Sequence, residues 1–272
     1  MRHDPGRAIV TATAFIVVAV LAIGVLAATR GESSGPSGAI RVAAAADLQF
    51  ALDEILADYA SSRAGRTVVP TYGSSGNAFS QISNGAPFDL FLSADIDYPR
   101  LLEAAGLVDP GTTQPYAVGR IVIWVPTGST IDVASLGMNA LTDPAARRIA
   151  IANPQHAPYG RAAVAAMEAS GVAEAVADRL VLGENVAQAA QFVESGAADI
   201  GIVALSLVRS PTLRDVGRYV EIPAELHPPI VQGAAVLAGS TDPEAARAFL
   251  AYVLGPAGRA VLERYGFDLP AD

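Results

Sequence analysis

Short, continuously apolar runs alternate with segments of helical periodicity from Ile40 onward. Apolar runs without polar alternation predict strands buried on both faces, as in parallel sheets. The intervening segments place apolar residues at helical spacing, as between Leu48 and Tyr59. The expected strands are 40–46, 67–72, 88–94, 121–126, 148–153, 200–205, 219–222 and 234–237, and the expected helices are 48–59, 98–105, 161–170, 186–194, 243–254 and 256–265. Strands alternating with helices predict a doubly wound α/β architecture.

The N-terminal segment has the pattern of a targeting signal. Arg2 and Arg7 precede an apolar run at 8–28, as a positive region precedes the apolar region of a signal peptide. A run of about 20 apolar residues is also long enough to cross a membrane as an uncleaved anchor. Both interpretations predict export, and the sequence leaves cleavage open. Residues 29–38 are rich in Gly and Ser, which predicts a flexible linker.

Composition narrows the possible functions. Of the 272 residues, 51% are hydrophobic and 17% are charged, which is typical of a globular protein. The chain has no cysteine, so a disulfide, a thiolate metal site and a cysteine nucleophile are all excluded. The net charge of −9 argues against binding to nucleic acid or to an anionic membrane surface. It does not exclude a small anionic ligand, because local donors govern a buried site.

Four junctions between an expected strand and the following helix carry candidate chemistry: 43–48 (AAAADL), 72–77 (YGSSGN), 153–160 (NPQHAPYG) and 183–186 (GENV). In open α/β sheets, ligands bind at the carboxyl ends of strands, beside helix N-termini. Such termini present unpaired N–H groups and the positive end of the helix dipole, which favours anions. Each motif alone is commonly just a turn or a cap, and His156 alone would be an ordinary loop residue.

Taken together and in order, these motifs resemble the molybdate-binding proteins of ABC importers. The most distinctive piece is the run Gly-Ala-Pro-Phe-Asp-Leu-Phe-Leu-Ser-Ala-Asp at 85–95. Further matching segments are 42–48, 73–76, 153–160, 201–203, 255–258 and 264–267. The resemblance covers nearly all of the chain after residue 38.

The resemblance implies a two-lobed periplasmic-binding-protein fold, in which each lobe is a mostly parallel sheet flanked by helices. Residues 1–38 would be the signal or anchor with its linker, 39–117 and 233–272 the first lobe, and 118–232 the second. The lobes would close on the ligand about crossings near 117–119 and 232–233. The implied cargo is molybdate or tungstate, held through its oxygens with no protein ligand to the metal and no cofactor. The implied partner is a membrane ABC permease, and the protein would be a periplasmic or otherwise extracytoplasmic monomer.

The resemblance also implies site residues. By position, the second serine of the family falls on Ser75, its loop amide on Tyr159 and its helix-start amide on Val186. The full expected ligand-binding set is Ala46, Asp47, Ser74, Ser75, Tyr159 and Val186.

Two positions depart from the family. The first family serine falls on Asp47, and the family tyrosine falls on Ala204. An ionised carboxylate would repel a dianion, so we expect Asp47 to turn away and cap its helix while its N–H serves the ligand. The alternatives are that Asp47 stays protonated and donates, or that it indicates a different cargo. The phenol of Tyr159 could replace the missing tyrosine.

Other functions stay open beside this one. Sulfate or phosphate could be the cargo, iron binding by the tyrosines is a weaker option, and residues 8–28 could anchor a membrane-bound ligand sensor. A serine hydrolase could use Ser74 or Ser75 with His156. The chain has only three histidines and no Gly-x-Ser-x-Gly elbow at these serines, which disfavours the hydrolase.

Overall fold

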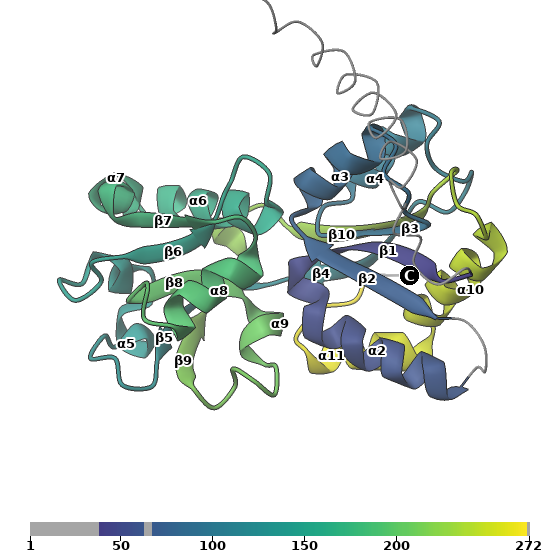
Figure 1. The fold of residues 1–272 in the computed structure, drawn as a ribbon. Helices are drawn as coiled ribbons and strands as arrows, with labels where there is room; N and C mark the ends of the chain where they lie inside the picture. Colours follow the sequence, from purple (N-terminus) through teal and green to yellow (C-terminus); the bar gives the residue numbers. More distant parts are fainter. Residues whose placement is uncertain (1–37, 63–66, 271–272) are drawn as a thin grey trace, which may run out of the picture. The chain divides into compact units, whose positions relative to one another are not determined.

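Two five-stranded sheets organise the protein in a computed structural model that describes residues 38–62 and 67–270 (Figure 1). The first sheet has the spatial order β2 (Val68–Gly73), β1 (Ile40–Ala45), β3 (Leu90–Ser93), β10 (Ile230–Val236) and β4 (Gln114–Gly119). The second has the order β7 (Leu180–Gly183), β6 (Ile149–Ala152), β8 (Ile200–Ala204), β5 (Ile121–Pro126) and β9 (Gly217–Glu221). One strand in each sheet, β10 or β5, runs antiparallel to both of its neighbours.

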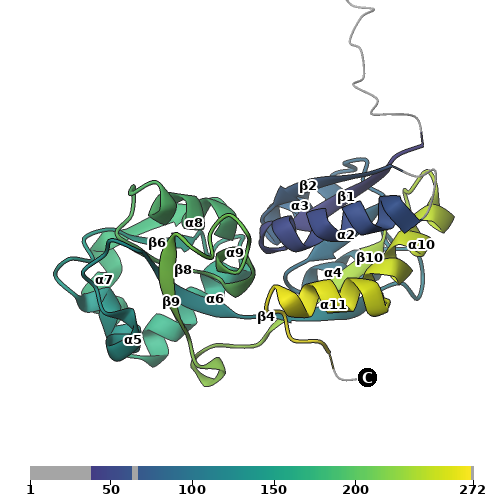
Figure 2. The same cartoon turned by 90° about the horizontal axis from the view of Figure 1, so that it is seen from below.

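Helices cover both faces of the first sheet. The chain moves outward from β1 to β2 and then back to β3, so right-handed crossovers place the two connecting helices on opposite faces. Figures 1 and 2 show α2 with α10 and α11 on one side, and α3 with α4 on the other. Their bounds are α2 (Gln49–Ser62), α3 (Ser75–Ser83), α4 (Asp97–Ala104), α10 (Pro243–Leu254) and α11 (Pro256–Arg264), with the 3-10 turn η1 (Ala46–Leu48) before α2.

The second sheet repeats this arrangement. The helix α6 connects β6 to β7, and α8 connects β7 back to β8, so the same rule places them on opposite faces. The helices here are α5 (Val133–Leu136), α6 (Pro158–Ala169), α7 (Ala173–Val176), α8 (Val186–Glu194) and α9 (Leu205–Val208), with 3-10 turns η2 (Gly137–Thr142), η3 (Ala177–Arg179) and η4 (Ala224–Leu226).

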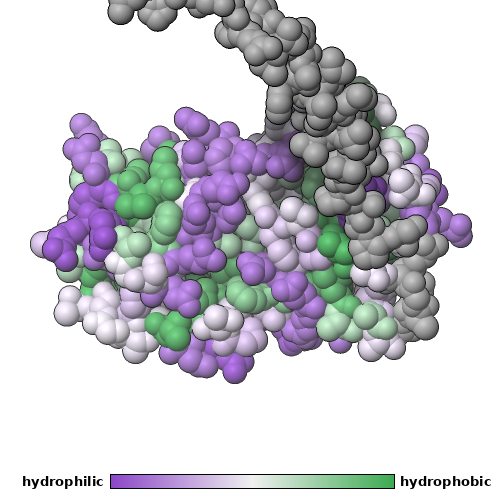
Figure 3. Space-filling model, in the orientation of Figure 1, coloured by the Kyte–Doolittle hydropathy of each residue, from purple (hydrophilic) through white to green (hydrophobic). Residues whose placement is uncertain are grey.

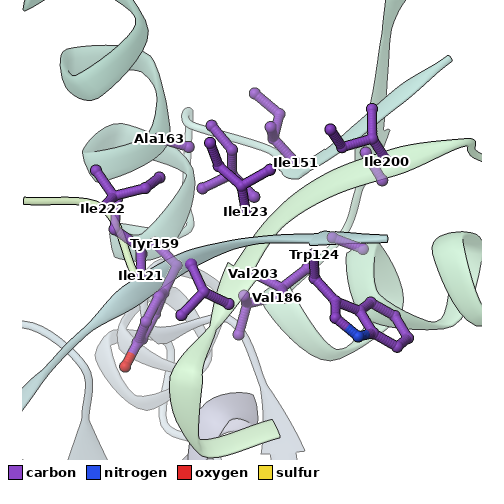
Figure 4. Packing of buried hydrophobic residues seen from close by; sticks show 14 of the residues in the cluster. Ile121, Ile123, Trp124, Ile151, Tyr159, Ala163, Val186, Ile200, Val203 and Ile222 are labelled. Atoms are coloured by element: carbon purple, nitrogen blue, oxygen red, sulfur yellow. The ribbon is translucent and has the colours of Figure 1, made fainter. Parts of the chain in front are cut away.

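Each sheet has its own core. The inner strands β1, β3, β6 and β8 are buried along almost their whole length, as expected of strands covered by helices on both faces. Figure 4 shows part of the core of the second sheet, in which Ile121 and Val203 lie beside Tyr159. On the face shown in Figure 3, hydrophilic residues are interspersed with smaller groups of hydrophobic ones.

The two-lobed α/β fold predicted from the sequence is confirmed, with local differences. The strands β4 and β7 and the helix α3 were not predicted, and β10 begins four residues before its predicted start. The strand β7 lies at a sheet edge with Leu182 exposed, so it lacks the apolar continuity of a buried strand. Only Ser75 and Ile82 of α3 are buried, which leaves it with little apolar periodicity.

The predicted signal or anchor at 8–28 lies outside the described residues, as does the linker up to residue 37. Within residues 38–62 and 67–270, no helix is both long and apolar enough to cross a membrane.

Candidate functional site

The four strand-to-helix junctions meet around one small cavity. Two junctions follow β1 and β2 of the first sheet, and two follow β6 and β7 of the second. The lining residues are Ala45, Ala46, Asp47, Gly73, Ser74, Ser75, Ala94, Ala157, Pro158, Tyr159, Asn185 and Val186. Every residue of the expected ligand-binding set is therefore at this cavity. Carboxyl ends of strands from two separate sheets face one small space.

The first lobe contributes hydroxyl groups that are oriented by the protein. Ser75 Oγ accepts a hydrogen bond of 2.8 Å from the backbone N–H of Ala94, and both Ser74 and Ser75 are buried. Ser74 Oγ lies 2.9 Å from His156 Nδ1, which donates to it when that nitrogen carries the proton. A hydroxyl that accepts from the protein keeps its own hydrogen for another acceptor. Ser75 can therefore donate into the cavity, and Ser74 can do so when Nδ1 of His156 carries the proton.

The second lobe contributes backbone N–H groups at two helix N-termini. The helix α6 begins with Pro158, which has no N–H, so its first available amide is that of Tyr159. At α8, the Asn185 side chain accepts from Gln188 N at 3.0 Å, and the Gln188 side chain accepts from Glu184 N at 2.7 Å. These caps leave the amide of Val186 without an intrahelical partner. Both termini place positive dipole ends at the cavity.

Asp47 is the one charged residue in the cavity lining, and its expected capping role is wrong. The N-cap of η1 is Ala45, and no side chain caps this turn. Instead, Asp47 Oδ2 accepts from Tyr159 Oη at 2.9 Å and from Gln232 Nε2. The side chain is buried, and a buried carboxylate requires hydrogen-bond donors, which Tyr159 and Gln232 supply here.

Burial also changes the ionisation of this carboxyl. Desolvation raises the pKa of Asp47 from 3.8 to about 6, against the opposing effect of the hydrogen bonds from Gln232 and Tyr159. Its second oxygen, Oδ1, is buried and has no hydrogen-bond partner among the residues that the structure describes. Asp47 is therefore protonated more readily than an exposed aspartate, but without ligand it is mostly ionised above about pH 6.

The phenol of Tyr159 has a different role from the one expected. Figure 4 shows its ring beside Ile121, with the hydroxyl pointing away from the apolar cluster. That hydroxyl donates to Asp47 Oδ2 and accepts from Gln232 Nε2 at 3.2 Å. Its hydrogen is therefore engaged within the protein, and the structure does not support the hypothesis that it replaces the family tyrosine. Ala204, at the position of that tyrosine, is buried at the end of β8.

Comparison with known proteins decides the family. Residues 40–268 match the family described as bacterial extracellular solute-binding protein. The chain belongs to this family. The molybdate-binding protein ModA of Azotobacter vinelandii is 38% identical over 232 residues, which cover 85% of this chain and 90% of that protein. ModA of Rhodobacter capsulatus is 35% identical, with 85% and 88% covered.

A solved structure agrees with these relatives. The periplasmic molybdate-binding protein of Azotobacter vinelandii superposes on this solute-binding protein with a TM-score of 0.80 and 32% sequence identity. The match covers 85% of this chain and all of that one. The two-lobed architecture is thus shared along almost its whole length.

Contacts between the lobes of this solute-binding protein surround the cavity. Gly76 N donates to the carbonyl of His156 at 2.9 Å, and Asn77 Nδ2 donates to Glu184 Oε1 at 3.2 Å. Arg161 forms an ion pair with Asp95 and donates to Tyr98 Oη at 3.2 Å. In each case, one partner follows β2 or β3 and the other follows β6 or β7. The structure is therefore closed around the cavity.

The two chain crossings lie side by side in the solute-binding protein. The strands β4 and β10 pair in antiparallel register, with Gly119 opposite Ile230 and Ala117 opposite Gln232. A Cβ atom at Gly119 would lie 2.2 Å from Tyr159 Oη, so only glycine fits beside the phenol. The crossings are thus in contact with the buried network of Asp47.

Gln232 was expected only as a hinge residue, but it also binds the buried carboxyl. Its amide donates to Asp47 and Tyr159, and its Oε1 accepts from Tyr116 Oη at 2.6 Å. A register shift between Gln232 and Gly233 interrupts β10 at this point. The sequence feature that could have indicated this role is a single polar amide side chain directly before the apolar run 233–237.

Within residues 38–62 and 67–270, no group of three or more His, Asp or Glu side chains is placed to hold a metal ion. The donors at the cavity suit the oxygens of an anion instead.

Proposed function

We propose that this solute-binding protein carries molybdate, or the nearly identical tungstate, to the permease of an ABC importer. The observation that carries the proposal is the convergence of hydroxyl and amide donors on one small cavity whose lining contains no cationic side chain. A fully deprotonated tetrahedral dianion has only acceptor oxygens, so it requires such donors. The names of the similar proteins from Azotobacter and Rhodobacter support molybdate as this cargo.

The proposed mechanism is closure of two lobes, 39–117 with 233–272 and 118–232, about the paired crossings. A bridging anion would accept from Ser74 and Ser75 on one side and from the amides of Tyr159 and Val186 on the other. Such a ligand favours the closed state because only that state offers both sets of donors. Closed protein would then dock on the permease, outside the cytoplasm and as a monomer. Cavity size would separate molybdate from sulfate, whose charge and shape are the same.

A ligand screen tests this function. The purified full-length chain is heated with molybdate, tungstate, sulfate, phosphate or ferric citrate at matched ionic strength. A ligand at a hundred times its dissociation constant adds about 2.7 kcal/mol to the free energy of unfolding. We expect molybdate and tungstate to stabilise the protein at far lower concentrations than sulfate does. Stabilisation by sulfate or phosphate alone, or by no oxyanion, would contradict the proposal.

A hydrolase is the second candidate, because Ser74 Oγ and His156 Nδ1 are within the distance of a nucleophile and its base. In a binding protein the same contact orients the serine hydroxyl toward the ligand. A turnover screen with ester and phosphoester substrates separates the two functions. Hydrolysis that is lost in Ser74→Ala would support the enzyme. If no hydrolysis exceeds the blank, the contact between Ser74 and His156 only orients the serine hydroxyl.

A further inference from the structure

We infer that the cavity binds its dianion together with one proton, which rests on Asp47 Oδ1 and is shared with an oxygen of the ligand. The inference deepens the proposed function and rests on it: Asp47 would set the pH range over which the protein loads its cargo.

The two oxygens of Asp47 are in different situations. Oδ2 is fixed as an acceptor, because Tyr159 Oη and Gln232 Nε2 both donate to it. Oδ1 is buried without a partner among the described residues, in a side chain that lines the cavity. This leaves Oδ1 as the oxygen available for a proton. A proton there turns an unpaired acceptor into a donor beside the other donors of the cavity.

Among the residues that the structure describes, no cationic side chain pairs with the carboxyl group of Asp47. From α6 it faces the phenol of Tyr159, from β10 the amide of Gln232 and from α9 the hydroxyl of Ser206, which donates to the backbone carbonyl of Asp47 at 2.7 Å. The phenol of Tyr116, on β4, contacts the group only through Gln232.

The remaining neighbours supply no charge to Asp47 either. From α8 the cavity receives Val186, and His156 contacts Ser74 rather than Asp47. The charged pair of Arg161 and Asp95 is half-exposed outside the cavity lining. Neutral donors alone stabilise the carboxylate, so an arriving dianion meets an uncompensated like charge.

This arrangement couples anion and proton. A bound dianion disfavours the carboxylate further, so the proton affinity of Asp47 rises on binding. Burial has already raised the pKa of Asp47 to about 6. Above that pH, each binding event must take up a proton from solvent. The apparent affinity therefore falls by up to about tenfold per pH unit above about pH 6, and is level below it.

The variant Asp47→Asn imitates the protonated acid. Its Oδ1 can accept from Tyr159 and Gln232 as Oδ2 of the acid does, and its NH₂ group then occupies the place of the unpaired oxygen. Asparagine cannot ionise, so this variant should bind the anion with an affinity independent of pH. At about pH 8 it should bind more tightly than the unaltered protein.

The test is titration calorimetry of molybdate into the full-length protein and into Asp47→Asn, at about pH 6, 7 and 8. Two buffers of different ionisation enthalpy at each pH give the number of protons taken up. We expect close to one proton per anion at about pH 8 for the unaltered protein, and none for the variant. Tight binding that is equal at all three pH values, with no proton uptake, would overturn this inference alone. Failure of both proteins to bind molybdate at any pH would overturn the proposed function and this inference with it.

Discussion

The two lobes have the same strand plan but supply different chemistry. The strand β6 has the place in its sheet that β1 has in the other, and β7 corresponds to β2. In both lobes these two strands lead into the cavity. The first lobe brings the side chains of Ser74, Ser75 and Asp47, whereas the second brings helix-start amides and uses its phenol to hold Asp47.

This difference shows which half of the site can change by mutation. Backbone amides persist through nearly every substitution, so the second lobe presents a constant set of donors. A single substitution removes a hydroxyl or carboxyl group. Asp47 already departs from the serine that the family resemblance implies. We therefore expect specificity and pH response to vary through the first lobe.

The largest effect should come from Ser75→Ala. This change removes a donor to a charged ligand and also leaves the buried N–H of Ala94 without its acceptor. We expect molybdate affinity to fall by about 100-fold, measured by calorimetry. The matched control is Ser80→Ala, which removes an exposed hydroxyl from the same helix and should leave affinity unchanged. Equal affinities for the two variants would show that the hydroxyl of Ser75 does not face the ligand.

Ionisation of Asp47 should make the free energy of unfolding depend on pH. The folded-state pKa of Asp47 is about 6, above its ordinary 3.8, so the neutral form is the stabilising one. That stabilisation is complete below about pH 3.8 and is lost as the pH rises through about 6. Without ligand, Asp47→Asn should therefore be more stable than the unaltered protein by about 2–3 kcal/mol at pH 8, and by little at pH 4.

Urea unfolding across this pH range checks the prediction. A difference between the two proteins that does not vary with pH would contradict it, because only ionisation of Asp47 produces the variation.

Deletion of an amide donor tests the second lobe. Val186 is the first residue of α8 and follows Asn185 in extended conformation, so proline can replace it without breaking the helix. Val186→Pro should weaken molybdate binding by about tenfold, through loss of the N–H. Val186→Ala keeps the N–H while losing a similar apolar contact, and it is the control. Should both variants bind alike, the second lobe would not donate through this amide.

The smallest effect should come from the contact that joins the lobes at the surface. Arg161 pairs with Asp95 and lies 5.7 Å from the ring centre of Tyr98, but it is 41% exposed. Exposed pairs contribute at most about 1 kcal/mol, so Arg161→Ala should speed molybdate release by about fivefold or less. The control Arg100→Ala removes an exposed pair with Asp97 within one lobe. An equal change in release rate for both would argue against a role in closure.

Local patterns account for what the sequence predicted well. Buried strands such as β1, β5 and β8 are continuous apolar runs, and the junctions are marked by glycine, serine and proline beside them. Because the carboxyl ends of parallel strands lie at one edge of a sheet, position in the sequence predicted that the two junctions of each sheet lie together. The meeting of the two pairs at one cavity was expected only from the family resemblance.

Side-chain partners across the fold could not be predicted in this way. Asp47 was expected to cap its own helix, but its donors lie 112 and 185 residues away in the sequence. Which of two roles a carboxyl adopts depends on what the folded chain places beside it. The same reason hid the role of Gln232 and the pairing of Tyr159.

The side-by-side course of β4 and β10 has a mechanical consequence. The C-terminal segment also bonds to β4, where Val118 and Asp268 exchange backbone hydrogen bonds of 2.7 and 3.0 Å. A single connecting strand would let the lobes rotate freely about it. Two hydrogen-bonded strands resist twisting, so the lobes can move easily only by bending about one hinge axis. The protein would then close by rotation about a single axis. An anion slightly too large for the cavity would prevent full closure, because the lobes could not shift sideways to accommodate it.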